Sequence, residues 1–345
     1  MDYRSAGVDI DASNETVRRI RTLARSTFTS GVLSDIGSFG GLFQLESGQF
    51  REPVLVASAD GVGTKLKIAF MMKRHDTVGC DLVNHCVNDI LVQGAEPLFF
   101  MDYFATGRLS TEVAEQVVGG IAASCRHNGC ALLGGESAEM PGFYGDGEYD
   151  LAGFIVGVVD RERLVNGRQI LVGDVLVGVP SSGLHTNGFS LARRIVFDRL
   201  GLSVDTWVPE LGRTVGEALM EPHRSYLPLI RPLLHGGRIK GMAHITGGGI
   251  TDNLPRVLPR GMSAVVDAAA WEIPPIFRWL QRHGEVPTED MMRTFNMGLG
   301  LVIVTARDKA EPLMEELAAR GGRDARVVGE IVHGEPPSVS YVNLS

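Results

Sequence analysis

One acidic residue stands directly before a short glycine-rich stretch that ends in a lysine. The residues are Asp60, Gly61, Gly63, Thr64 and Lys65, within ASADGVGTK (57–65). A carboxylate leaving a buried strand could hold a cation, glycines let backbone N–H groups approach a phosphate, and a lysine adds a point charge. The acid precedes the glycines, so this is not the G-x-x-x-x-G-K-[ST] P-loop. The pattern is typical either of a metal-bound phosphate site or of a β-turn with a solvated lysine.

Further polar residues gather on one face of a helix predicted over residues 79–94. The stripe consists of Asp81, Asn84, His85 and Asn88. Asp89 lies beside it, about 80° around the helix from Asp81 and roughly 12 Å further along. Asp81 and Asp89 are therefore not expected to share one ion, and only one of them is a candidate ligand. The alternative is an ordinary half-buried helix with one polar face.

A third acid, Glu136, follows two glycines in LLGGESAEMPG (132–142), where a predicted strand at 130–133 ends. An oxygen ligand is thereby presented at a sheet edge. Mg²⁺ prefers few carboxylates, several waters and the phosphates of its substrate. Asp60, Asp89 and Glu136 would suffice for such a site.

Two glycine-rich loops in the second half could bind anions. The first is VPSSGLHTNGFSL (179–191), with Ser181, Ser182, Gly183, His185 and Asn187; the second is HITGGGITDNL (244–254), with Gly247, Gly248 and Gly249. Each precedes a predicted helix, whose N-terminus favours negative charge. A substrate phosphate is the natural guest of the first loop, and an anion or a nucleotide that of the second. The alternatives are a capped loop with Asn187 as N-cap and a flexible connector. Neither G-x-G-x-x-G nor G-x-S-x-G occurs, so dinucleotide-binding and serine-nucleophile readings lack support.

The elements that must position these residues alternate between helices and strands in both halves. Predicted helices cover 14–26, 79–94, 111–127 and 309–320, with others beginning near Phe189 and Thr251; predicted strands cover 54–59, 97–105, 130–133, 149–159, 174–179, 242–245, 263–266, 299–305 and 326–331. The pattern resets near 161–171, where we place a domain boundary. The mixture predicts an α+β fold rather than a regular doubly wound sheet.

Composition narrows the functional class. A chain of 345 residues is long for one core and favours two domains. Its net charge of -8 argues against nucleic acid or an anionic membrane as the main partner. The four cysteines form no C-x-x-C pair, and no run approaches ~18 apolar residues, so we expect a cytoplasmic protein without a signal peptide or a transmembrane helix. The acids and glycine-rich loops of both halves together predict a metal–nucleotide enzyme with a phosphorylated substrate.

Six segments, taken in order, resemble the phosphoribosylformylglycinamidine cyclo-ligase (aminoimidazole ribonucleotide synthetase) family. They are DYRSAGVDI (2–10), SADGVGTKL (58–66), GCDLVNHCVNDILVQGAEPLFFMDYFATG (79–107), GGESAEMPGFY (134–144), PSSGLHTNGFSL (180–191) and ITGGGITDNLPR (245–256). One departure is the segment SGVLSDIGSFGGLF (30–43), where Ser34, Asp35 and Ser38 stand at positions that are commonly glycine in the family.

The resemblance implies two mixed α/β domains, 1–165 and 166–345. It implies an N-terminal sheet that pairs across a homodimer, and a C-terminal sheet covered by helices. It also implies ATP-dependent cyclisation of formylglycinamidine ribonucleotide to 5-aminoimidazole ribonucleotide, with ATP and Mg²⁺ as cofactors. Carried over by position, the catalytic residues would be Asp89, His185 and Lys65, and the metal ligands Asp60, Asp89 and Glu136. ATP or substrate contacts would come from Asp60, Gly61, Gly63, Thr64, Asp102, Ser181, Ser182, Gly183, Asn187, Gly247, Gly248 and Gly249.

Related ATP-binding families fit less well. Selenophosphate synthetase needs a cysteine or selenocysteine near its N-terminus, whereas the first cysteine here is Cys80. The hydrogenase maturation member ends in a reactive cysteine, whereas this chain ends in YVNLS. Thiamine monophosphate kinase has differently spaced aspartates, and the amidotransferase subunit of the preceding purine step is usually much longer. A catalytically silent ATP-binding scaffold would have lost its acids, but all three acids are present.

Overall fold

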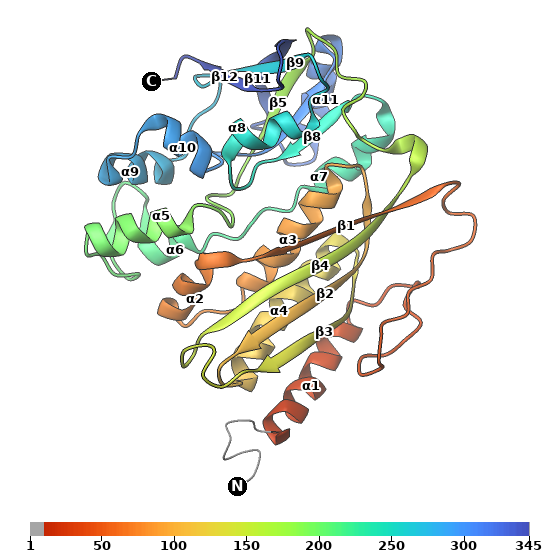
Figure 1. Cartoon of the computed structure of the whole chain (residues 1–345), viewed down its shortest axis with the longest axis vertical. Coiled ribbons are helices and arrows are strands. Elements are labelled where there is room, and N and C mark those ends of the chain that lie inside the picture. The colour runs from red at the N-terminus through yellow and green to blue at the C-terminus, as the bar shows by residue number, and fades with distance from the viewer. Residues whose placement is uncertain (1–9, 345) are drawn as a thin grey trace. The chain divides into compact units, whose positions relative to one another are not determined.

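The computed structural model describes residues 10–344, which divide into two compact units (Figure 1). The first unit ends at Glu162, and the second begins at Arg163 and includes Leu91–Gly94. Apart from Ile10, the DYRSAGVDI segment lies outside the described residues. Both units mix helices with sheets, so the predicted α+β class is confirmed. Among the described helices, none has the length and apolar character needed to cross a membrane.

The first unit is a four-stranded sheet in the order β1-β4-β2-β3, packed with helices on one face (Figure 1). Only β2 and β3 run parallel. The strands are β1 (Pro53–Gly61), β2 (Glu96–Thr106), β3 (Ala131–Glu139) and β4 (Tyr149–Asp160), and the helices are α1 (Ile10–Arg25), α2 (Leu66–Met72), α3 (Val78–Leu91) and α4 (Thr111–Asn128). The apolar periodicity that predicts the α3 helix is met, because its Leu82, Val83, Cys86, Val87, Ile90 and Leu91 are all fully buried.

Strand register sets four residues side by side across this sheet. Asp60 pairs with Gly153, Gly153 with Asp102, and Asp102 with Gly135. Directly paired residues share a face of the sheet. A Cβ on Gly153 would lie 2.9 Å from the Leu82 side chain on α3. Asp60 and Asp102 therefore belong to the face that the helices cover.

Two strand predictions need correction. β1, expected to be buried, is an edge strand in which only Val56 is buried. β3, expected to end before Gly134, continues to Glu139 because it stays paired with β2 across a register shift. Its glycines therefore lie within the strand, and Glu136 is not at the strand's end.

The second unit is built on a six-stranded sheet in the order β12-β9-β11-β5-β10-β8, with a two-stranded hairpin of β6 and β7. Its strands are β5 (Val175–Pro180), β6 (Trp207–Val208), β7 (Arg213–Thr214), β8 (Gly241–His244), β9 (Met262–Asp267), β10 (Leu299–Thr305), β11 (Arg326–His333) and β12 (Val339–Val342). Its helices are α5 (Phe189–Arg193), α6 (Val215–Leu219), α7 (Leu227–Ile230), α8 (Gly249–Asn253), α9 (Pro275–Gly284), α10 (Thr288–Thr294) and α11 (Ala310–Ala319). The interior strand β10, which pairs with β5 and β8, is buried at every residue, and this explains its continuous apolar sequence.

Candidate active site

Two of the predicted metal ligands converge in the first unit. Asp60 lies near the end of β1 and Asp89 in the last turns of α3, and both face His85, one helical turn before Asp89. The His85 Nε2 atom is 2.8 Å from Asp60 Oδ2 and 3.7 Å from Asp89 Oδ2. The Ser58 hydroxyl donates to Asp89 Oδ2 at 3.0 Å, and the Gly61 N–H donates to Asp60 Oδ1 at 2.7 Å.

Electrostatics favour the ionised form of Asp60. Burial alone would raise the pKa of Asp60, but the hydrogen bond and charge of His85 and the Gly61 N–H lower that pKa below its usual value. Burial also opposes the charged form of His85, yet its bond to Asp60 and the nearby Asp89 raise its pKa above the ordinary value. Both carboxylates remain partly exposed, at 45% for Asp60 and 26% for Asp89. Two accessible carboxylates beside one histidine nitrogen fit the oxygen donors that Mg²⁺ selects.

Glu136 does not lie close to Asp60 and Asp89 of the same chain. It lies on β3, three strand spacings from β1, or roughly 14 Å at ~4.8 Å per spacing. Side chains alternate along β3, so Glu136 also belongs to the opposite row from Gly135 and Asp102. One ion held by Asp60, Asp89 and Glu136 of the same chain does not fit this geometry.

Lys65 has a different environment from the one expected at a phosphate. It lies in the turn Gly63–Lys65, whose Gly63 has a φ of +67°. Its Nζ atom is 2.8 Å from both carboxylate oxygens of Asp81 on α3, and both side chains are fully buried. The lysine therefore fastens the turn after Asp60 to the same helix that carries Asp89, instead of presenting its charge to an open phosphate site.

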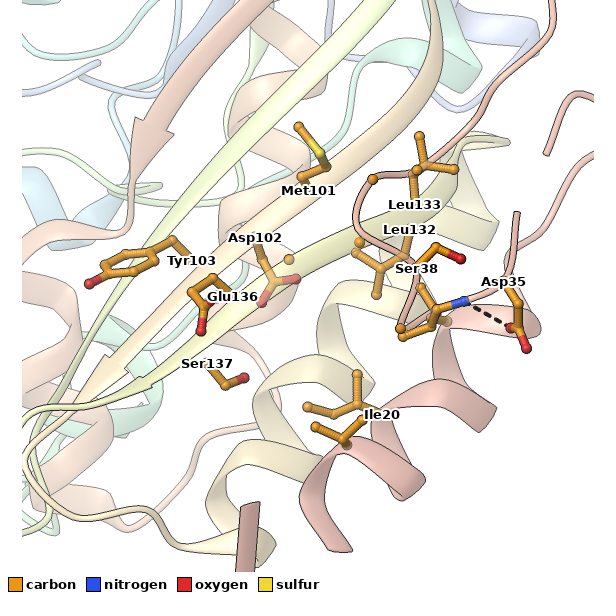
Figure 2. Close-up of a pocket in the computed structure, with 18 of the residues that line it drawn as sticks. Ile20, Asp35, Ser38, Met101, Asp102, Tyr103, Leu132, Leu133, Glu136 and Ser137 are labelled. Carbon is orange, nitrogen blue, oxygen red and sulfur yellow. Dashed lines mark hydrogen bonds between the residues drawn. The ribbon is translucent and has the colours of Figure 1, made fainter. Parts of the chain in front are cut away.

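A cavity of about 590 Å³ opens near the β3 edge of the same sheet, around Asp102 (Figure 2). Its volume is within the usual range for small-molecule sites. The walls come from α1, the segment 35–41, β2, β3 and β4, and include Ile20, Met101, Asp102, Leu132, Glu136 and Phe154. Figure 2 shows apolar side chains such as Ile20 and Leu132 beside the carboxyl groups of Asp102 and Glu136, so the lining is mixed.

Asp102 owes its position in this cavity to a glycine on the neighbouring strand. A Cβ on Gly135 would lie 2.3 Å from Asp102 Oδ1 and 2.7 Å from the Asp102 carbonyl oxygen. Burial raises the pKa of Asp102 to about 7. A carboxyl group in this state can either donate or accept a hydrogen bond near neutral pH.

The raised pKa of Asp102 predicts a measurable pH dependence of stability. The folded protein keeps this proton between about pH 4 and 7, where the unfolded chain has lost it, so stability falls as pH rises through that window. Relative to Asp102→Asn, the wild type should lose up to about 1.4 kcal/mol per pH unit there. Urea unfolding of both proteins at pH 5 and pH 7 measures this slope. Parallel pH profiles would contradict the assigned burial.

The segment 35–41 that borders the cavity is fastened to α1 by residues that replace expected glycines. The Arg25 guanidinium forms a two-pronged ion pair with Asp35 and lowers the pKa of Asp35 to about 2. The Ser34 hydroxyl accepts a hydrogen bond from the Leu42 N–H at 2.7 Å. The departures at Ser34 and Asp35 therefore add specific contacts to this segment.

In the second unit the fold brings both predicted anion loops together. A Cβ on Gly247 would lie 3.3 Å from the Asn187 Oδ1 atom, so the two glycine-rich loops adjoin. In the second loop, Gly248 and Gly249 have φ values of +98° and +61°. In the first loop, the residue directly before helix α5 is Gly188 and not Asn187. The alternative that makes Asn187 the N-cap is therefore wrong.

The serines of the first loop hold its backbone rather than point freely into a site. The Ser181 hydroxyl bonds to Asn296 Oδ1 and the Gly183 carbonyl, each at 3.0 Å. The Ser182 hydroxyl donates to the Pro222 carbonyl at 2.6 Å, while the Ser182 N–H donates to His185 Nε2 at 3.2 Å. An accepting Nε2 requires the neutral His185 tautomer with its proton on Nδ1.

His185 belongs to a buried cluster that the sequence did not predict, with His223 and His244. The rings of His185 and His223 stack at 3.9 Å with 19° between their planes, and His223 Nε2 is 3.0 Å from His244 Nε2. Lone pairs in two nearly parallel rings do not converge on one point, so stacking and hydrogen bonding describe this cluster better than metal ligation. His244 is the first residue of the second glycine-rich loop, but nothing in the sequence indicates that it lies beside His185 and His223, which are 59 and 21 residues earlier.

Comparison with known proteins identifies the family. The model for "AIR synthase related protein, N-terminal domain" matches residues 49–159, and that for its C-terminal domain matches residues 172–342. Phosphoribosylformylglycinamidine cyclo-ligase of Syntrophotalea carbinolica is 54% identical over 340 residues, covering 97% of each chain. The cyclo-ligase of Trichlorobacter lovleyi is 53% identical, covering 95% of this chain and 94% of the relative.

Solved structures share the fold at much lower identity. Thiamine-monophosphate kinase from Stenotrophomonas maltophilia is 19% identical with a TM-score of 0.68, covering 94% of this chain and 96% of the other. Hydrogenase maturation protein HypE in complex with ATP is 16% identical with a TM-score of 0.66, covering 95% and 92%. These likenesses concern architecture alone, whereas matches above 50% over nearly the whole chain decide the family. The chain belongs to the phosphoribosylformylglycinamidine cyclo-ligase family.

Proposed function

We propose that this protein catalyses the ATP-dependent cyclisation of formylglycinamidine ribonucleotide to 5-aminoimidazole ribonucleotide, releasing ADP and phosphate. Identity of 54% to a protein named for this activity supports the reaction. The observation that carries it in the structure is the convergence of Asp60 and Asp89 on His85. An ATP-bound relative of the same fold, HypE, supports nucleotide use.

The chemistry explains why ATP is needed. The formyl oxygen is a poor leaving group, so its attack on the γ-phosphorus of ATP forms an O–P bond and releases ADP. The amidine nitrogen then closes the five-membered ring on the activated carbon, and phosphate leaves with the former formyl oxygen. The protein's work is mainly to position the reactants and neutralise charge.

Mg²⁺ bound with ATP would neutralise phosphate charge during this transfer. Asp60 and Asp89 would hold it, since both carboxylates are partly exposed and approach the same His85 nitrogen. Thr64, Gly61 and Gly63 follow Asp60 directly, where their backbone can approach the phosphates.

The adjoining loops of the second unit would hold the ribonucleotide phosphate. Asn187 adjoins Gly247 at the start of the run 247–249, and Gly183 lies four residues earlier in the same loop as Asn187, so these residues could supply backbone and amide donors. In its neutral form His185 accepts from the Ser182 N–H, so taking up a proton on Nε2 would break that bond. This arrangement favours a binding role for His185 over a role as general base.

A homodimer through the first sheet is the proposed assembly. The face of this sheet that helices leave uncovered carries Leu55, Met101 and Phe154, which are 61%, 37% and 44% exposed. Large apolar side chains gathered on one face are typical of an interaction site. A partner covering this face would remove them from water.

Replacing Leu55 and Phe154 together with glutamate should convert the dimer to monomer, because two like charges would be buried in the interface. Light scattering after size-exclusion chromatography measures the mass, against the 37.2 kDa of one chain. Val342→Glu, at an exposed apolar residue of the second unit, is the matched control and should leave the mass unchanged. A wild type of one-chain mass would contradict the proposed assembly.

The proposed location is the cytoplasm. Cys80, Cys86, Cys125 and Cys130 are all free, as expected where glutathione keeps thiols reduced.

Turnover tests the proposed reaction. Purified protein incubated with formylglycinamidine ribonucleotide, Mg²⁺ and ATP should form ADP and the aminoimidazole product in equal amounts. ADP without product would favour another kinase-like activity of this fold. Nucleotide binding without turnover would favour the scaffold alternative.

A further inference from the structure

His85 lies where the two proposed metal ligands meet, yet no part of the reaction chemistry requires a histidine there. Its side chain is 4% exposed, and its Nε2 atom faces carboxylates from two separate elements, β1 and α3. The distances are 2.8 Å to Asp60 and 3.7 Å to Asp89. Ionised carboxylates only accept hydrogen bonds, so the nitrogen between them must carry a proton.

The other contacts of the two acids come from their own surroundings. Asp60 Oδ1 accepts from the Gly61 N–H at 2.7 Å, while Asp89 Oδ2 accepts from the Ser58 hydroxyl at 3.0 Å. These bonds orient each acid, but neither joins Asp60 directly to the helix. His85 makes that connection, because it extends from the helix that also carries Asp89.

We propose that His85 is a positioning residue that holds the Asp60 and Asp89 carboxylates at the separation needed to bind one Mg²⁺–nucleotide. The inference rests on the proposed function. Two carboxylates this close repel one another, and an N–H donor between them offsets that repulsion before the cation arrives. Groups that orient metal ligands in this way typically contribute 10–100-fold to metal affinity.

Substitutions at His85 distinguish the contribution of its N–H donor from the contribution of its side-chain volume. His85→Leu keeps much of the volume and removes the donor, so Mg²⁺-dependent affinity should fall at least tenfold. His85→Gln places an amide N–H near the position of Nε2 and should stay within about threefold of wild type. His85→Asn carries the same amide on a shorter side chain that cannot reach Asp60, so it should resemble His85→Leu.

The measurement is calorimetric titration with a non-hydrolysable β,γ-imido analogue of ATP, with Mg²⁺ and with EDTA in its place. His75→Leu is the matched control, since His75 is a buried histidine of the same unit that bonds Tyr149 instead of the acids. It should bind like wild type. In EDTA the His85 variants and the wild type should bind the analogue equally weakly, because the variants are expected to lose only the Mg²⁺-dependent part of the affinity.

Outcomes separate this inference from the function on which it rests. Wild-type affinity for the Mg²⁺–analogue in His85→Leu, or equal weakness in His85→Gln and His85→Leu, would overturn the positioning role alone. A wild type whose binding does not depend on Mg²⁺ would overturn the proposed function and this inference together. Thermal unfolding followed by circular dichroism establishes that each variant is folded. If His85→Leu does not fold, the comparison of His85→Asn with His85→Gln serves in its place.

Discussion

Asp89→Asn and Asp60→Asn should each lower kcat/KM for Mg²⁺–ATP by about 10³-fold. Each change removes a full negative charge from the place where two carboxylates converge on His85. Charge stabilisation by a bound cation contributes several kcal/mol to phosphoryl transfer, and each 1.4 kcal/mol corresponds to a factor of ten in rate. Steady-state kinetics with ADP and product followed together measures the effect.

The amide variants keep the shape of the side chain, so folding should be preserved. Glu136→Gln is an informative comparison, because Glu136 lies three strands away from Asp60. An effect of Glu136→Gln equal to that of Asp89→Asn would mean that a third acid reaches the metal by a route outside the single chain. Near-normal activity in Asp89→Asn would contradict the assigned metal site.

Lys65→Met should destabilise the protein by about 3–5 kcal/mol, because it leaves the buried Asp81 carboxylate without its cation. The two side chains are completely buried and the Nζ atom contacts both carboxylate oxygens at 2.8 Å. At about 2–4 °C per kcal/mol, the melting temperature should fall by roughly 6–20 °C. Differential scanning calorimetry gives the shift.

A double replacement shows how much of the lost stability comes from breaking the charge pair and how much from lost packing. Lys65→Met with Asp81→Leu removes both charges, so it should recover much of the stability that either single change costs. Arg74→Met provides a surface control, because the Arg74–Asp76 ion pair is about half exposed on both sides and exposed pairs contribute little. Equal losses in the double and single variants would show that packing alone decides the effect.

The elements that hold the site were largely predictable because their signals are local. The apolar spacing of α3 identifies the helix, and the same spacing places His85 one turn from Asp89. The short helices α6, α7, α9 and α10 were not predicted, since four to ten residues give little periodic signal.

The partners of the site residues were less predictable, because they depend on strand order and register. Nothing near Glu136 in the sequence says that β3 lies three strands from β1. Likewise, Lys65 follows glycines in a way that suggests a phosphate contact, and only the packing of its turn against α3 shows that Asp81 is its partner. The link between His85 and Asp60 crosses 25 residues of sequence and becomes visible only in three dimensions.

The most direct test of the reaction uses substrate labelled with ¹⁸O in the formyl group. After turnover with Mg²⁺ and ATP, the released phosphate is examined by ³¹P NMR for the isotope shift. Transfer of one ¹⁸O to each phosphate, matched by equal ADP and aminoimidazole ribonucleotide, is the predicted result. Unlabelled phosphate alongside a closed ring would contradict activation at the formyl oxygen, and absence of the ring product would contradict the cyclo-ligase assignment.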